Sequence, residues 1–260
     1  MKLPDSFMPD KDLEGKVDVL LSTPDFNEQG LAIAVEDSTA VNRGKIYVWE
    51  PSMIRPELVN ERKYMVIDFC YHDSQLYDCG AYTRVSNALT DDELLTQLSA
   101  AYSLCHYNGE LVYSNLGTIY SGDSKLKERL GCVFALRTHN GELYDAGTEQ
   151  CVYSTMKNKF VAKRDDTIRA LCSHQGSLYD AGHYMGVKNT YTNETVAERA
   201  HIIYALCSFR GTLLEGGTSG MVTDVFSDKL LLDFGYSTVT ALEMIPVSLV
   251  KNLVNFRKKS

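Results

Sequence analysis

One phrase recurs along this chain of 260 residues at nearly constant intervals. In one copy, residues 168–182, it reads IRALCSHQGSLYDAG, and variants begin near residues 65, 101, 133 and 203. A repeat of this length is one supersecondary unit that cannot bury its apolar surface alone, so neighbouring units must pack against one another. One alignment position, here called the anchor, holds Cys70, Cys105, Arg137, Cys172 and Cys207, at spacings of 35, 32, 35 and 35 residues.

Each unit divides into four short segments typical of strands. In the unit that begins at Ile168, strands are expected over 168–173 and 177–184, near Val187, and over 195–200. Short apolar runs punctuated by glycine and polar turn residues indicate an all-β array. Two further columns mark the second and third strands: Gly80, Gly147, Gly182 and Gly217, with Asn115 in that place in one unit, and Val85, Val152, Val187 and Val222.

The order of these strands resembles the inner-to-outer order of the blades of β-propellers. The segment GKIYVWEPSMIRPELV, residues 44–59, is similar to the third strand, turn and fourth strand of a WD40 blade. The Gly-His and Trp-Asp pairs of WD40 repeats are absent, and the units are shorter than the usual blade of about 40–45 residues. The resemblance therefore implies the architecture, an all-β propeller of four-stranded antiparallel blades, and no specific family.

Six full units are expected, starting near residues 17, 65, 101, 133, 168 and 203. A last echo, VTALEM from Val239, could open a seventh blade or add a strand that closes the ring. We therefore expect an N-terminal extension over 1–16, a propeller over 17–244, and a tail over 245–260 that could form a helix.

An acidic column and a basic column suggest paired charges. The acids are each preceded, sixteen residues earlier, by an arginine. In the unit of Cys105 both are lost together, with Tyr113 and Gln97 in their places. Joint loss favours buried pairs, because an unpaired buried charge costs several kcal/mol. We expect each arginine to bridge to the next blade; an acid that bonds only backbone amides in a turn is the alternative. The expected pairs are Arg62 with Asp78, Arg129 with Asp145, Arg164 with Asp180, and Arg199 with Glu215.

A histidine column lies two residues after the anchor. His72, His139 and His174 are expected in the turn between the first and second strands, on one face near the axis. There, with Arg137 and Arg210, they could bind a ligand at the channel mouth, or they could be ordinary turn residues copied by the repeat. We expect Tyr77, Tyr144 and Tyr179 to pack between blades.

The anchor cysteines raise the possibility of zinc. Structural zinc usually takes cysteines in closely spaced pairs, whereas each of these lies on a different unit, so core packing is the expected role. No metal, cofactor or catalytic residue is predicted.

Charge and cysteine content limit the partners and the compartment. The net charge of −8 with scattered Lys and Arg argues against a nucleic-acid surface. No apolar run is long enough for a secretory signal or a membrane span. Seven cysteines, an odd number, indicate reduced thiols in a cytoplasmic protein.

Three functions remain open. The first is a non-enzymatic, monomeric scaffold whose loop faces bind a protein or peptide. The second is a small-ligand-binding or enzymatic propeller with a polar site at the channel mouth. The third is sugar recognition by equivalent pockets between blades.

Overall fold

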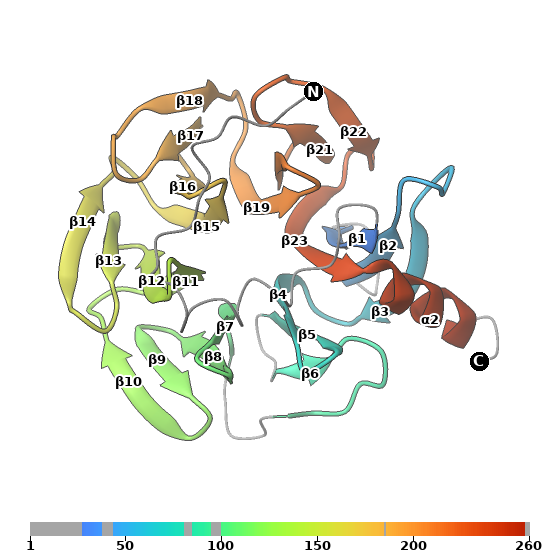
Figure 1. The fold of residues 1–260 in the computed structure, drawn as a ribbon, viewed down its shortest axis with the longest axis horizontal. Coiled ribbons are helices and arrows are strands. Elements are labelled where there is room, and N and C mark those ends of the chain that lie inside the picture. The colour runs from blue at the N-terminus through green and yellow to red at the C-terminus, as the bar shows by residue number, and fades with distance from the viewer. Residues whose placement is uncertain (1–27, 38–43, 81–84, 95–99, 185, 258–260) are drawn as a thin grey trace, which may run out of the picture.

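The computed structural model describes residues 28–37, 44–80, 85–94, 100–184 and 186–257. Six antiparallel sheets, the blades of a propeller, surround a central axis (Figure 1). Their innermost strands form a closed ring in which each contacts its two neighbours. The predicted fold class is therefore confirmed.

Blade 1 combines both ends of the described chain. Its strand order is β23-β1-β2-β3, with β23 innermost. The bounds are Thr238–Pro246 for β23, Gln29–Glu36 for β1, Gly44–Trp49 for β2 and Glu57–Arg62 for β3. The echo VTALEM thus lies in a strand that closes the ring, and the described residues form six blades, not seven. The expected start of the propeller near residue 17 lies outside the described residues.

The other blades follow the chain from the axis outward. Blade 2 has three described strands, and the bridge between Ser86 and Glu93 extends its outer side. Blades 3 to 6 each have four strands. The bounds are, for blade 2, β4 Val66–His72, β5 Gln75–Gly80 and β6 Ser86–Asn87; for blade 3, β7 Ser103–Tyr107, β8 Glu110–Asn115, β9 Thr118–Ser121 and β10 Ser124–Glu128; for blade 4, β11 Val133–His139, β12 Glu142–Gly147, β13 Cys151–Ser154 and β14 Lys159–Lys163; for blade 5, β15 Ile168–His174, β16 Ser177–Gly182, β17 Gly186–Asn189 and β18 Thr195–Glu198; and for blade 6, β19 Ile203–Phe209, β20 Thr212–Gly217, β21 Met221–Asp224 and β22 Leu230–Asp233.

The repeated glycines have a steric cause. A Cβ added at Gly182 would lie 2.1 Å from the carbonyl oxygen of Thr167, and one at Gly147 would lie 1.8 Å from that of Cys132. The chain entering each inner strand therefore presses against the second strand, and only glycine fits there.

Two-residue turns join the first and second strands. Asn140 and Gly141 both have positive φ, 49° and 72°, as a type I′ hairpin requires. Because successive strands are antiparallel, these turns and the turns between third and fourth strands lie on one face of the ring. The starts of the inner strands lie on the other face, here called the mouth face. It is opposite the turns in which the histidines were expected.

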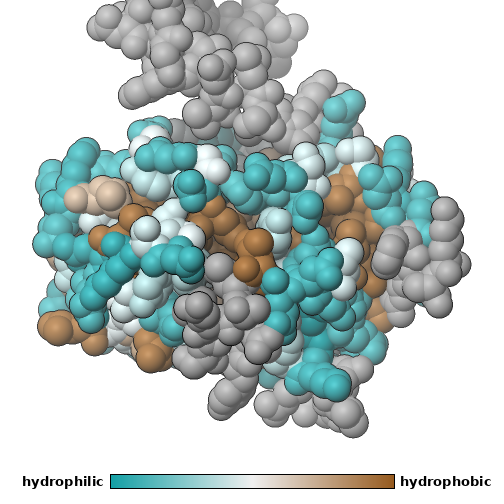
Figure 2. All heavy atoms as spheres, turned by 90° about the horizontal axis from the view of Figure 1, so that it is seen from below, coloured by the Kyte–Doolittle hydropathy of each residue, from teal (hydrophilic) through white to brown (hydrophobic). Residues whose placement is uncertain are grey.

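The core lies between neighbouring sheets. The valine column is fully buried. The side chains of each inner strand pack alternately against the two neighbouring blades. The helix α2, Val247–Arg257, packs Val250 and Leu253 against Ile46 and Ile245 of blade 1. No helix in the described part of the chain is long and apolar enough to span a membrane. Seen from the side, hydrophobic atoms are mostly recessed behind hydrophilic ones (Figure 2).

Candidate functional site

The arginine and acid columns form ion pairs between neighbouring blades. Arg164 follows β14 of blade 4, and Asp180 lies on β16 of blade 5. Nε of Arg164 donates to Oδ1 of Asp180, and Nη2 donates to Oδ2, both at 2.6 Å. The side chains are 1% and 0% exposed, so water does not screen the pair. Similar contacts join Arg129 to Asp145 at 2.7 Å, Arg62 to Asp78 at 2.5 Å, and Arg199 to Glu215.

A threonine and an asparagine complete the pairs of blades 4 and 5, and these residues were not predicted from the sequence. The Thr190 hydroxyl donates to Asp180 at 2.8 Å, and Arg164 Nη1 donates to Asn193 Oδ1 at 2.7 Å. Blade 4 repeats the arrangement with Thr155 and Asn158. The signal was present, because a threonine and an asparagine follow both Asp145 and Asp180 by ten and thirteen positions.

Blade 3, which lacks the acid, fills the same place differently. Tyr113 is 3% exposed, stacks on Tyr120 at a centroid distance of 5.3 Å, and donates its hydroxyl to the Gly122 carbonyl at 2.9 Å. A neutral side chain thus replaces the charge. Gln97, in the arginine position, lies outside the described residues.

The histidines do not converge on the axis. They end the inner strands instead of lying in the turns, and each points between two blades. Nδ1 of His139 lies 2.8 Å from the Ser173 hydroxyl of the next blade, and Nδ1 of His174 lies 2.9 Å from that of Ser208. Burial lowers the pKa of both imidazoles. Aromatic rings cover them on the outside: Tyr144 and Tyr191 for His139, and Tyr179 and Phe226 for His174.

His72 and Arg210 also make local contacts. Nε2 of His72 lies 3.2 Å from Oδ2 of Asp73, and its ring lies 5.1 Å from that of His106. Arg210 occupies the left-handed position of its turn, and its backbone N–H donates to Gln29 Oε1 at 2.8 Å. Arg210 thus links blade 6 to blade 1. Of the five residues predicted to line a site at the channel mouth, only Arg137 faces the channel.

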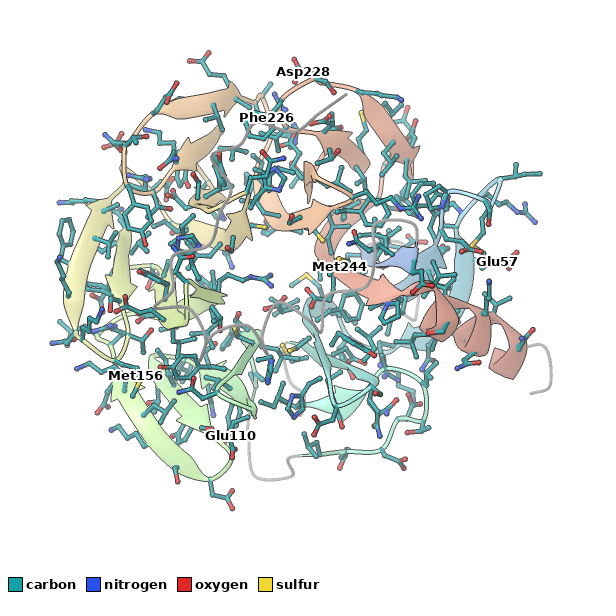
Figure 3. All side chains as sticks on the ribbon, in the orientation of Figure 1. Glu57, Glu110, Met156, Phe226, Asp228 and Met244 are labelled. Atoms are coloured by element: carbon teal, nitrogen blue, oxygen red, sulfur yellow. The ribbon has the colours of Figure 1, made fainter. Side chains whose placement is uncertain are left out.

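Arg137 meets an acid from the opposite side of the ring. Glu243 occupies the anchor position of β23, three blades away from Arg137 in either direction. Nη1 of Arg137 lies 3.7 Å from Oε2 of Glu243, and the side chains are 26% and 15% exposed, facing the channel. Burial raises the pKa of Glu243 to about 7, although Arg137 opposes the rise. This pair crosses the channel, and Met244 lies beside the same central opening (Figure 3).

The anchor cysteines are buried between these charged residues. Burial raises the pKa of the Cys172 thiol to about 11 and raises that of Cys70 and Cys207 as well, so they are neutral thiols at pH 7. Over the described ranges, no group of three or more His, Cys, Asp or Glu side chains has an arrangement that could hold a metal ion.

A hydrogen-bonded chain on the mouth side links three blades. The Ser103 hydroxyl donates to Asp68 Oδ2 at 2.7 Å and accepts from the Leu136 N–H at 2.9 Å. Burial raises the pKa of Asp68. These bonds satisfy the carboxylate within the ring.

A small hollow of about 20 Å³, roughly the space that one or two water molecules need, lies next to these residues on the mouth side. Its lining includes Phe134, Arg169 and Tyr204, which occupy the same place on three neighbouring inner strands, three residues before the anchor. The Arg169 Cζ lies 3.9 Å from the Phe134 ring centroid and 5.6 Å from that of Tyr204. Tyr102 extends the arc, with its ring edge-on to Phe134 at 5.5 Å.

Arg169 is held from a second side. Its Nε donates to Nε2 of His183 at 3.1 Å, and burial lowers the pKa of both side chains. This arc was not predicted from the sequence. The signal was a column of large or polar residues near the start of every inner strand: Ile67, Tyr102, Phe134, Arg169, Tyr204 and Thr240.

Comparison with known proteins shows the fold. No protein-family model matches the chain, and no curated protein matches it. Among solved structures, the WD40 β-propeller domain of Doa1 is similar with a TM-score of 0.57 and 12% identity, over 84% of this chain and 83% of that one. A chain of a mitotic checkpoint complex has a TM-score of 0.53 and 12% identity, covering 82% and 77%. The computationally designed protein Ika8 has a TM-score of 0.50 and 15% identity, covering 81% and 89%.

Proposed function

We propose that this chain is a non-enzymatic binding scaffold that presents its mouth face to a protein or peptide. The observation that carries the proposal is the arc of Tyr102, Phe134, Arg169 and Tyr204 around a hollow on the axis. Tyrosine and arginine are the residue types that most often dominate binding at protein interfaces, especially near the centre of the contact. The arc combines partly exposed aromatic rings with a fixed cation, which suits recognition of a polypeptide.

The similar structures are consistent with this proposal. One of them is part of a mitotic checkpoint complex, an assembly of proteins. At 12% identity the likeness concerns the fold, so the proposal depends on the surface of this chain. As part of the proposal, we place the protein in the cytoplasm, because all seven cysteines are free thiols. It acts as a monomer, because one chain closes the ring.

The small-ligand or enzymatic alternative receives less support. It required polar side chains from several blades to converge at the channel mouth. His139 and His174 instead bond to serines of the next blade, and Arg210 bonds to Gln29. Sugar recognition by equivalent pockets likewise has no observation that favours it, because the places between blades are filled by the paired charges and by aromatic rings.

Two matched variants test the proposal. Tyr204→Ala removes one ring of the arc. Met156→Ala removes a half-exposed side chain near the outer rim (Figure 3), in the turn after β13, which the strand order places on the opposite face. Each purified chain is used as bait in native lysate, at two salt concentrations, after its folding has been checked by circular dichroism. We expect a bound protein that Tyr204→Ala loses and Met156→Ala retains. Equal retention by both variants would contradict binding at the mouth face.

A further inference from the structure

We infer that Arg169 is the recognition residue for a carboxylate, so the partner presents an aspartate, a glutamate or a C-terminal carboxylate to the axial hollow. This inference rests on the proposed function and deepens it by naming the chemistry that the mouth face selects.

The guanidinium of Arg169 is held in one orientation before any ligand binds. One face stacks on Phe134, with Cζ 3.9 Å from the ring centroid, and Nε is engaged by His183. The hydrogen bonds within the described residues use only Nε of this side chain. The edge that carries Nη1 and Nη2 is therefore available, and it presents parallel N–H groups that match the two oxygens of a carboxylate.

Arg169 differs from the arginines that hold the ring together. Arg62, Arg129, Arg164 and Arg199 each lie against a buried acid, and Arg137 faces Glu243. Arg169 has an imidazole beside it instead. The closest acid in sequence, Asp166, is exposed and accepts from the Thr167 N–H at 2.6 Å. A partly buried cation without an acid in contact gains most from a ligand that brings one.

The surroundings favour a single negative charge over a double one. Arg137, the other arginine of the lining, is paired with Glu243, and Asp68 adds a carboxyl group to the same lining, so one cationic edge, that of Arg169, is left for a ligand. A phosphate dianion would bring two negative charges to this single arginine. A carboxylate brings one negative charge, which one arginine can offset. The rings of Phe134 and Tyr204 also offer apolar contact to the methylene groups of a glutamate.

The test uses two uncharged-backbone probes that differ in one functional group. N-acetyl-L-glutamate N-methylamide and its glutamine analogue are titrated separately into the ¹⁵N-labelled full chain, and the arginine Nε–H signals are followed by NMR. Arg169→Gln assigns its own signal, and Arg55→Gln, at an exposed position of blade 1, is the matched control. Thermal unfolding of each variant shows whether it is folded.

We expect the glutamate probe to shift the Arg169 Nε–H signal with an affinity about tenfold or more above that of the glutamine probe, since hydrogen bonds to charged groups are the strong ones. Arg55→Gln should leave this response unchanged, and Arg169→Gln should abolish the perturbation of signals around the hollow. The two-probe comparison on the unchanged chain needs no variant, so an unfolded Arg169→Gln does not weaken the test.

Three results would overturn the inference: no shift at Arg169 with either probe, equal affinity for the two probes, or tighter binding of inorganic phosphate than of the glutamate probe. The proposed function fails separately. A partner that Tyr204→Ala loses, together with no response to the glutamate probe, would leave the scaffold role standing and remove only the carboxylate. A response of Arg169 to the glutamate probe, without any protein bound at the mouth face, would support carboxylate binding and contradict the scaffold role.

Discussion

Replacing Arg164 by leucine tests whether the paired charges hold the blades together. The change removes two hydrogen bonds of 2.6 Å to Asp180 and one of 2.7 Å to Asn193. It leaves Asp180, which is 0% exposed, with the Thr190 and Tyr184 hydroxyls as partners but without a counter-charge. Breaking a buried pair from one side costs roughly 3–5 kcal/mol. Because two hydroxyl donors remain, we expect a value near the lower end, about 3 kcal/mol.

Equilibrium unfolding in urea, at pH 7 and 25 °C, measures this loss from the shift of the midpoint. Lys159→Met, at an exposed position of β14, the strand that Arg164 follows, is the control and should change the free energy of unfolding by less than about 0.5 kcal/mol. The double variant Arg164→Leu with Asp180→Asn should lose less than the sum of the two single changes, because no charge is left unpaired. A loss below about 1 kcal/mol for Arg164→Leu would refute the reasoning.

Two other changes probe the blade contacts and the channel. Gly182→Ala places a Cβ 2.1 Å from the Thr167 carbonyl oxygen, a clash that the backbone must move to relieve. It should destabilise the fold by more than Gly109→Ala, whose Cβ meets no atom within 4 Å and whose only cost is the φ of 82° that alanine must adopt; equal losses in urea unfolding would contradict this. The pKa of Glu243 is raised to about 7 from 4.5, so its favourable contribution is present below pH 4.5 and is lost as the pH rises through 7. The stability of Glu243→Gln relative to the unchanged chain should therefore improve by roughly 3 kcal/mol between pH 4 and pH 8, and a difference that is the same at both pH values would contradict it.

Much of the fold could be predicted because the repeat copies local constraints. The glycine after each acid is required by a carbonyl oxygen about 2 Å from where its Cβ would be, and the turn Asn140-Gly141 requires positive φ. Such constraints act within one unit, so they recur at the period of the unit. The joint loss of acid and arginine around Tyr113 was visible for the same reason.

The role of VTALEM could not be decided from its pattern. An inner strand of a seventh blade and an inner strand added to blade 1 have the same apolar alternation. Only the pairing of Leu242 with Ile33 and of Ala241 with Ala34 separates the two, and this contact joins residues more than 200 positions apart.

The candidate site was harder to predict from the sequence than the fold. The histidine column repeats, but Ser173 and Ser208 of the next blade decide where His139 and His174 point. Arg169 stands alone in a column that otherwise carries no charge, so no repetition marked it. The rings on either side of it lie on different blades, so its surroundings could not be predicted from one repeat unit.

The most direct test of the proposed function is site-specific photocrosslinking from the two faces. Tyr204 is replaced by p-benzoylphenylalanine in one preparation and Met156 in another, and both are irradiated in native lysate. We predict a defined crosslinked protein from position 204, attached through a segment that contains an acidic residue or the C-terminal carboxylate, and none from position 156. The same protein crosslinked from both positions, or only from position 156, would contradict binding at the mouth of the ring.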